Sequence, residues 1–225
     1  MQPSHIDPAF HKRLFRVLMF DPLEPIMLPP VLRRIADAMP GMTIECVRGT
    51  ADFAASLRTG EIDLACYAYP VGAPDIIAIP IVSTDAVAIA RRGHPGIGGT
   101  LDRTTFGALG HVTLVPPLRG LVKLNENLAA QGLKRRVVYM VNKMASIAPI
   151  VERTDLIGVL PRWFAHRIAR NFDIVIHEMP VMLPAQTVHM LWHARNTDDP
   201  GHHWLREAML AAFREDISPR DGNGS

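Results

Sequence analysis

The segment of residues 135–161 constrains the fold more than any other stretch of the chain. Val137–Val141 is a run of β-branched, aromatic and apolar residues, which predicts a strand buried on both faces. Asn142 can cap a helix, and residues 145–151 then carry apolar side chains at helical spacing. Leu156–Leu160 is a second apolar run. Strand, helix and strand within about 25 residues form a βαβ unit, which requires a parallel sheet.

The turn between this first strand and its helix is a candidate binding position. In open parallel sheets, ligands bind beyond the carboxyl ends of the strands, where helix N-termini point. Here that position holds Asn142, Lys143 and Met144. A polar, a cationic and a soft apolar side chain suit the lip of a pocket and do not form a catalytic set. The same spacing fits an ordinary turn with an exposed lysine, so both interpretations stay open.

The remainder of the chain repeats the alternation of strands and helices. The first 70 residues predict the order βαβαβ. Strands are expected at Leu14–Phe20, Thr43–Val47 and Ile62–Tyr67, with Thr50 placed to cap the second helix. The first helix is expected to turn five apolar residues inward: Ile26, Met27, Leu32, Ile35 and Ala36. After a long strand at Ile81–Ala90 a second series follows, so we expect two small α/β subdomains and a cleft suited to a small molecule.

Composition argues against several classes of protein. Hydrophobic residues make up 48% of the chain and charged residues 20%, which is typical of a soluble globular protein. A formal charge of +2 gives no electrostatic footprint for nucleic acid. No apolar run reaches the ~18 residues of a membrane span, and the first 13 residues lack a signal-peptide core, so we expect a cytoplasmic protein. Cys46 and Cys66 fall in expected strands, which favours reduced, buried thiols over a disulfide.

Motifs for catalysis are missing from the sequence. It contains no GxGxxG, Walker loop, GxSxG or HExxH pattern. His189 and His193 would lie about 13 Å apart on one face of a strand, and His202 and His203 would point apart on a helix. Neither cysteine has a basic neighbour in the sequence. We therefore expect no enzyme, no metal ion and no cofactor.

Five stretches, taken in order, resemble one family. They are LPPVLRRIADAMPGMTIE (28–45), LRTGEIDLA (57–65), RRGHP (91–95), RTDLIGVLPRWFA (153–165) and MLWHARNTDDPGHHWLREAM (190–209). Together they resemble the effector-binding domain of a LysR-type transcriptional regulator, over about residues 13–214. The last stretch is the most specific. It resembles the subgroup of activators that respond to salicylate, nitroaromatic compounds and flavonoids.

The resemblance implies an α/β fold of two Rossmann-like subdomains joined by two crossover strands, of the periplasmic-binding-protein-like type 2. Subdomain I would comprise residues 14–85 and 190–217, and subdomain II residues 86–189. Residues 1–13 would be a linker remnant and residues 218–225 a disordered tail. The winged helix-turn-helix of the family is absent from this sequence, so DNA would be bound only through that missing N-terminal domain.

The resemblance also implies an effector site, whose positions carry over one at a time. They are Phe20, Asp21 and Pro22 after the first strand, Ile26 and Met27 on the next helix, Thr50, then Arg119, Leu121, Lys143 and Met144 in the second subdomain. Each has a simpler role as well: Asp21 or Thr50 can cap a helix, and the apolar residues can be core.

These residues predict a sensor of a small aromatic effector, a phenolate or a carboxylate. Two helix N-termini would face the effector, with Lys143 and Arg119 adding charge. Binding would shift the lobes and pass the change to DNA-binding heads. The resemblance also implies a homodimer or tetramer, in which the first helix and second strand of one copy pack against the second subdomain of another. The alternatives are a solute-binding protein of the same fold, which would need an export signal, and an enzyme, which would need a catalytic set.

Overall fold

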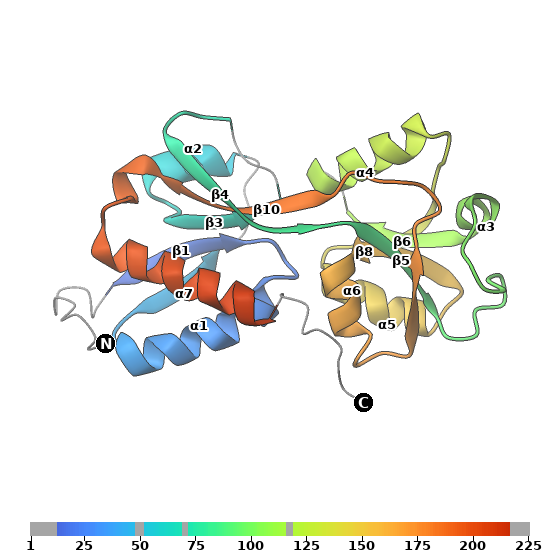
Figure 1. The fold of residues 1–225 in the computed structure, drawn as a ribbon, viewed down its shortest axis with the longest axis horizontal. Coiled ribbons are helices and arrows are strands. Elements are labelled where there is room, and N and C mark those ends of the chain that lie inside the picture. Colours follow the sequence, from blue (N-terminus) through green and yellow to red (C-terminus); the bar gives the residue numbers. More distant parts are fainter. Residues whose placement is uncertain (1–12, 48–51, 69–71, 116–118, 217–225) are drawn as a thin grey trace. The chain divides into compact units, whose positions relative to one another are not determined.

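A computed structural model describes residues 13–47, 52–68, 72–115 and 119–216, with the backbone alone for residues 119–121 and 216. Within these ranges the chain is an α/β protein with two five-stranded sheets, as the sequence predicted (Figure 1). It divides into two compact units.

The chain passes between the units twice. Unit 1 takes the residues up to Val82 and from Thr187 onward, and unit 2 runs from Ser83 to Gln186. Each division falls three residues before the boundary predicted from the sequence. The single strand predicted at Ile81–Ala90 is in fact two strands, because the chain leaves one sheet before Asp85 and enters the other after it.

Unit 1 contains a sheet in which three neighbouring strands run parallel. Its elements are β1 (Leu14–Met19), α1 (Glu24–Ala38), β2 (Thr43–Val47), α2 (Phe53–Thr59), β3 (Leu64–Tyr67), β4 (Ile76–Thr84), β10 (Gln186–His193), the 3₁₀ turn η3 (Ala194–Asn196) and α7 (Pro200–Asp216). The strand order is β2-β1-β3-β10-β4, with β1 parallel to both β2 and β3 and β10 antiparallel to β3. Helices α1 and α7 pack against each other.

The inward face of α1 differs from the predicted one. Met27, Val31 and Ile35, at helical spacing of four, are buried. Leu32 is 48% exposed and Ala36 is exposed, so these two predictions were wrong. The buried stripe follows the spacing of four from Met27 through Val31, and Leu32, the next residue after Val31, is turned about 100° away from it.

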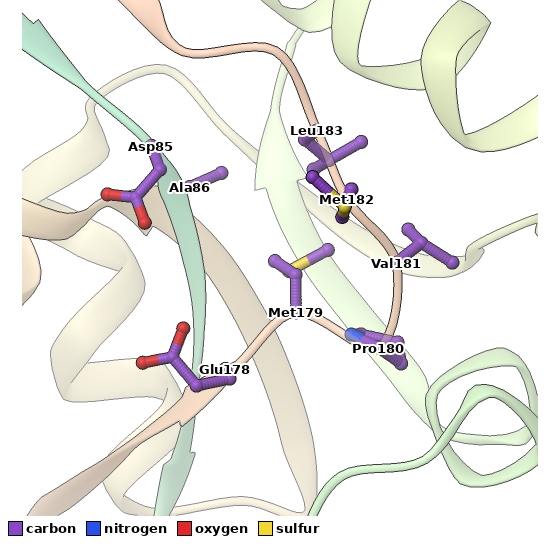
Figure 2. A pocket seen from close by; sticks show the side chains of 8 residues that line it. All are labelled: Asp85, Ala86, Glu178, Met179, Pro180, Val181, Met182 and Leu183. Atoms are coloured by element: carbon purple, nitrogen blue, oxygen red, sulfur yellow. The ribbon is translucent and has the colours of Figure 1, made fainter.

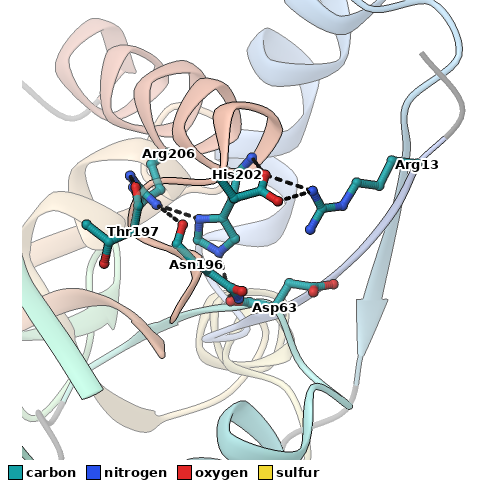
Figure 3. A network of polar contacts seen from close by, with 7 residues as sticks. Arg13, Asp63, Asn196, Thr197, His202 and Arg206 are labelled. Carbon is teal, nitrogen blue, oxygen red and sulfur yellow. Dashed lines mark hydrogen bonds and ion pairs between the residues drawn. The ribbon is translucent and has the colours of Figure 1, made fainter. Parts of the chain in front are cut away.

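A polar network holds the start of α7 against the beginnings of β1 and β3 (Figure 3). His202 is fully buried, with Nδ1 2.7 Å from Arg206 Nη1 and Nε2 2.9 Å from the carbonyl oxygen of Asp63. Because a guanidinium can only donate, Nδ1 accepts, and Nε2 carries the hydrogen that it donates to Asp63. The backbone N–H of His202 donates to Asp199, whose carboxylate pairs with Arg13 at 2.6 Å. His202 is therefore held as the neutral imidazole.

Arg206 extends this network into the turn before α7. Its guanidinium donates to the carbonyl oxygens of Asn196 and Thr197, at 3.1 and 2.8 Å. Its carbon Cζ also lies 4.6 Å from the centre of the Trp192 ring, a cation–π distance. The buried guanidinium is thus compensated by carbonyl oxygens and an aromatic face.

Unit 2 has the strand order β7-β6-β8-β5-β9. Its elements are β5 (Ala86–Arg91), α3 (Arg103–Ala108), β6 (Gly110–Leu114), α4 (Arg119–Ala130), β7 (Arg136–Val141), the 3₁₀ turn η2 (Met144–Ser146), α5 (Ile147–Glu152), β8 (Leu156–Pro161), α6 (Arg162–Ile168) and β9 (Ile174–Glu178). β6 is parallel to both β7 and β8, which confirms the predicted parallel βαβ unit, with β6 lying between its two strands. β5 is antiparallel to β8 and β9.

The prediction that Val137–Val141 is buried on both faces was wrong. β7 is an edge strand, and Val137, Val138, Tyr139 and Met140 are 41 to 56% exposed. Only Val141 is buried. An apolar, β-branched run can form either a central strand or an edge strand, so the sequence alone could not distinguish the two positions.

Close packing of α5 on the sheet depends on Gly158 of β8. A Cβ atom at this position would lie 2.5 Å from Ile147 Cγ2 and 3.3 Å from Ile89 Cγ1. Ile147 and Ile89 are both buried. The helix and the sheet therefore meet at a position that admits no side chain.

We expect Gly158→Ala to destabilise the protein by about 1–3 kcal/mol, because the methyl group overpacks a filled core. Gly98→Ala is the matched control, since nothing lies within 4 Å of a Cβ atom there. Chemical denaturation of both variants measures the effect. Equal unfolding midpoints for the two variants would contradict the packing described for α5.

A second prediction concerns the stability of unit 1 at low pH. Burial lowers the pKa of His202 from its ordinary value of 6.5, and the charge of Arg206 lowers it further, while the bond to Asp63 opposes the shift. The unfolded chain thus takes up a proton at a higher pH than the folded protein. The stability that His202 contributes is present above about pH 6.5 and is lost as the pH falls below it.

His202→Gln can replace both ring hydrogen bonds with one amide and does not titrate. Its free energy of unfolding should therefore fall less than that of the wild type between about pH 7.5 and about pH 5.5. His166→Gln, which removes an exposed histidine of α6, should keep the wild-type dependence. Denaturation curves at each pH give the comparison, and parallel behaviour of wild type and His202→Gln would exclude this role.

Candidate functional site

The predicted positions in unit 2 gather at the carboxyl ends of two neighbouring parallel strands. Leu114 at the end of β6 is paired with Val141 at the end of β7. The backbone N–H of Val115 extends this ladder by donating to the carbonyl oxygen of Val141, at 2.9 Å. The chain after each strand, including Lys143, therefore leaves the sheet at the same edge.

Lys143 is an exposed cation at this edge. Its side chain has no hydrogen-bond or ion-pair partner within the part of the chain that the structure describes. The next residue, Met144, is 6% exposed and begins the 3₁₀ turn. An exposed ammonium next in sequence to a buried thioether suits an anion that also carries an apolar body.

The helix start after β7 differs from the prediction. Asn142 does not cap it: the chain first forms the 3₁₀ turn η2, with Lys143 at the cap position and no side-chain capping bond. The α-helix that follows, α5, has six residues. A short helix reached through a 3₁₀ turn adds little dipole to the site, so the charge here belongs mainly to Lys143.

The second pair of predicted residues in unit 2 lies at the start of α4. Arg119 and Leu121 belong to the first turn of this 12-residue helix. The structure describes their backbone but not their side chains. Their contact with an effector therefore stays a prediction.

The predicted positions in unit 1 gather at the corresponding edge of its sheet. Phe20, Asp21 and Pro22 follow β1, and the N–H of Phe20 donates to the carbonyl oxygen of Cys66 on β3, at 3.0 Å. The Phe20 ring lies edge-on to Tyr67, with centroids 6.3 Å apart. Asp21 is partly buried and Pro22 is buried.

Tyr67 is a candidate that the sequence did not single out. It ends β3 at this edge, and its ring also lies 5.2 Å from that of Phe53. Its place as the last residue of an expected strand was the available signal, because the carboxyl end of a parallel strand is where ligands bind.

The remaining predicted positions in unit 1 fall in the core or outside the described residues. Ile26 and Met27, in the first turns of α1, are 3% and 0% exposed. Their alternative role as core residues fits this burial, and effector contact stays a prediction. Thr50 lies outside the described residues. Asp52 caps α2 instead, accepting from the N–H of Ala55 at 3.1 Å.

The two cysteines are unsuited to nucleophilic chemistry. Both are free thiols, and they lie on β2 and β3, the two strands that flank β1. Burial, together with the nearby Glu24 carboxylate, raises the pKa of Cys46 to about 11. Burial raises the pKa of Cys66 to about 12. Each thiol therefore stays protonated at neutral pH, whereas a nucleophile needs the thiolate.

The histidines of β10 are held by local contacts. His189 Nδ1 lies 3.0 Å from the carbonyl oxygen of Thr187, and His193 Nδ1 accepts from the N–H of Arg195 at 3.1 Å. Among the described residues, no group of three or more His, Cys, Asp or Glu side chains could hold a metal ion. The described helices include none with the length and apolarity needed to cross a membrane.

This combination defines a class of protein. Each unit is an α/β layer structure built on parallel strands, the exposed Lys143 of unit 2 lies where such strands end, and the chain passes twice between the units. That is the architecture of the two-lobed, periplasmic-binding-protein-like ligand-binding domains. The chain belongs, within this class, to the LysR substrate binding domain family, whose model matches residues 10–214.

Individual relatives agree with this assignment. The chain is 29% identical to the HTH-type transcriptional activator NagR of Ralstonia sp and 26% identical to NahR of Pseudomonas putida. Each match covers 93% of this chain and 70% of the relative. A solved structure, the effector binding domain of QuiR in complex with shikimate, shares the fold with a TM-score of 0.71 at 12% identity. That match covers 92% of this chain and 99% of QuiR's.

Proposed function

We propose that this domain senses a small aromatic carboxylate or phenolate, which binds at the carboxyl edge of the unit 2 sheet. The observation that carries the proposal is Lys143, which is exposed, has no partner among the described residues and is followed in the chain by the buried Met144. The ammonium would pair with the anionic group, and the thioether and the neighbouring turn would contact the ring.

The relatives support a sensing role for this chain. NagR and NahR are transcriptional activators, and QuiR holds shikimate, a cyclic carboxylate, in its effector-binding domain. Because this chain spans 70% of NagR and NahR, we assign DNA binding to the part of such proteins that lies outside the match. The domain would act in the cytoplasm as the sensor of a transcription factor, and not as an enzyme.

Isothermal titration with 2-hydroxybenzoate, benzoate, phenol and an amino acid tests the ligand class. We expect heat with at least one aromatic anion. Lys143→Ala should weaken that binding at least about tenfold, or ~1.4 kcal/mol, because the anion loses its charge partner. Lys134→Ala, which removes another exposed lysine of unit 2, should leave the affinity unchanged.

Two results would count against the assignment. Tight binding of the amino acid with no heat from any aromatic compound would overturn the aromatic class. An unchanged dissociation constant in Lys143→Ala would return Lys143 to the role of an ordinary exposed turn residue.

We further propose that two copies of the chain cover each other's exposed apolar surfaces. Four consecutive residues of β7 from Val137 to Met140 are about half exposed on an edge strand, and Leu32 of α1 is 48% exposed. An unprotected apolar edge strand is a ready site for pairing with another chain. In an antiparallel pair, α1 and β2 of each copy would meet unit 2 of the other copy. The exposed apolar residues of α1 and β7 would then be buried in both copies.

Tyr139→Lys places a charge in the middle of this surface and should shift the protein from dimer or tetramer toward monomer. Met182→Lys is the matched control, because Met182 is 91% exposed elsewhere in unit 2. Sedimentation velocity over a range of protein concentrations measures the distribution. A wild type that stays monomeric at high concentration would refute the pairing.

A further inference from the structure

The chain enters and leaves unit 2 at the same edge of its sheet. The outgoing passage reaches unit 2 at Ser83 and enters β5 at Ala86, and the returning passage leaves β9 after Glu178. β5 is antiparallel to β8 and β9, so the start of β5 lies beside the ends of both. β8 is parallel to β6 and β7, so this edge also carries Lys143.

Arg162 joins both passages at this edge. It follows β8 directly, and its backbone N–H donates to the carbonyl oxygen of Asp85 at 3.0 Å. Its guanidinium donates to the Asp85 carboxylate through Nε at 2.8 and 2.9 Å and through Nη2 at 2.6 Å. It also forms a fork with the Glu178 carboxylate, through Nη1 at 2.7 Å and Nη2 at 2.6 Å. We call Asp85, Arg162 and Glu178 the Arg162 triad.

The charges of the triad stabilise one another. Hydrogen bonds from Arg162 lower the pKa of Asp85 and of Glu178, and the two carboxylates raise the pKa of Arg162. All three groups therefore stay ionised throughout the neutral range. A lysine could not replace the planar fork, since it offers one point charge in place of several fixed donors.

The returning passage also packs on unit 2 beyond the triad, with Met179 and Leu183 against its core. A cavity of about 380 Å³ separates it from the outgoing passage, with Asp85 and Ala86 on one side and residues 178–183 on the other (Figure 2). Val181 is buried in the core of unit 2, and Gln131 Nε2 donates to the carbonyl oxygen of Met182 at 2.7 Å. The two passages are thus tied across this gap by Arg162.

We propose that Arg162 is a positioning residue that fixes both chain passages to unit 2, so that they move as one when an effector binds. This inference rests on the proposed function. β7 and β8 lie two strands apart, so Lys143 and Arg162 leave the sheet about 10 Å from each other along one edge. An effector that displaces the turn after β7 therefore acts on the same edge of the sheet that carries the triad. Any change in the angle between the two units then occurs in residues 83–84 and 184–186, which lie outside the triad.

The triad is itself at the surface, with the side chains of Asp85 and Glu178 48% and 73% exposed, so its location and not its burial sets it apart from other ion pairs. Exposed pairs stabilise a protein by about 0–1 kcal/mol and have no required location. Arg92 and Asp173 form such a pair at 2.6 Å at the opposite ends of the same strands, β5 and β9, and both side chains are about two-thirds exposed. This pair is the internal control for the triad.

Hydrogen–deuterium exchange of the full chain without ligand tests the triad first. In Arg162→Ala, peptides covering residues 83–86 and 178–186 should exchange at least about tenfold faster than in the wild type, while β6 and β8 stay protected. Arg92→Ala should leave both passages unchanged. Exchange that stays at the wild-type rate in both passages, or that rises throughout unit 2, would overturn the proposal.

Two further variants guard against a general loss of folding. Arg162→Lys keeps the charge and loses the fork, and should show faster exchange confined to the two passages. The double variant Arg162→Glu with Glu178→Arg rebuilds the pair between positions 162 and 178 with its charges exchanged, and it leaves a glutamate facing Asp85. Slow exchange should therefore return in residues 178–186 and not in residues 83–86. Failure to restore protection in residues 178–186, alongside a normally folded protein, would show that the pair does not hold the returning passage.

The effector step uses 2-hydroxybenzoate as the probe. In Arg162→Ala, its dissociation constant by titration should stay within about twofold of the wild-type value. The slowing of exchange that it causes in residues 83–84 and 184–186 of the wild type should be lost. Loss of binding in Arg162→Ala would make Arg162 a binding residue instead. If no aromatic anion binds the wild type, the proposed function fails, and the ligand-free exchange experiment still decides whether Arg162 fixes the passages.

Discussion

The parallel pairing of β6 with both β7 and β8 is the constraint on which the proposed binding edge of unit 2 depends. Since parallel strands end on the same side, this pairing brings Lys143, the start of α4 and Arg162 to one edge of the sheet. The antiparallel strands β5 and β9 then add the carboxylates of Asp85 and Glu178 to that edge. Gly158 of β8 lets α5 pack closely on the face of this sheet, because a side chain at that position would collide with the helix.

The structure treats its polar groups in two ways. At the beginnings of β1 and β3, His202 and Arg206 are buried, and each has several hydrogen-bond partners. Such groups cost free energy unless they are paired, and here they hold α7 to the sheet. Lys143 is exposed and lacks a partner among the described residues. A site for an external anion needs the second arrangement, because a cation that is already neutralised gains little from a ligand.

The sequence predicted the alternation of elements well, because apolar runs and breaks are local signals. Strands such as Leu14–Met19 and the parallel unit around residues 135–161 were therefore found. Burial was harder to predict: the apolar run of β7 is exposed, and the inward face of α1 is rotated away from Leu32. Asp52 caps α2, a position that several residue types suit, so the sequence alone could not select it. The Arg162 triad joins residues far apart in sequence, so no local pattern could have identified it.

The division of the chain has a consequence for how the protein is made on the ribosome. Unit 2 is one uninterrupted segment, and all its strands have been synthesised once residue 186 has emerged. In unit 1, β4 reaches its sheet only through β10, which is made about a hundred residues later. Domains generally fold as units during synthesis. The middle of this polypeptide can therefore mature first, while the earlier half of unit 1 waits, incomplete and in need of protection, for the last strand and helix to be translated.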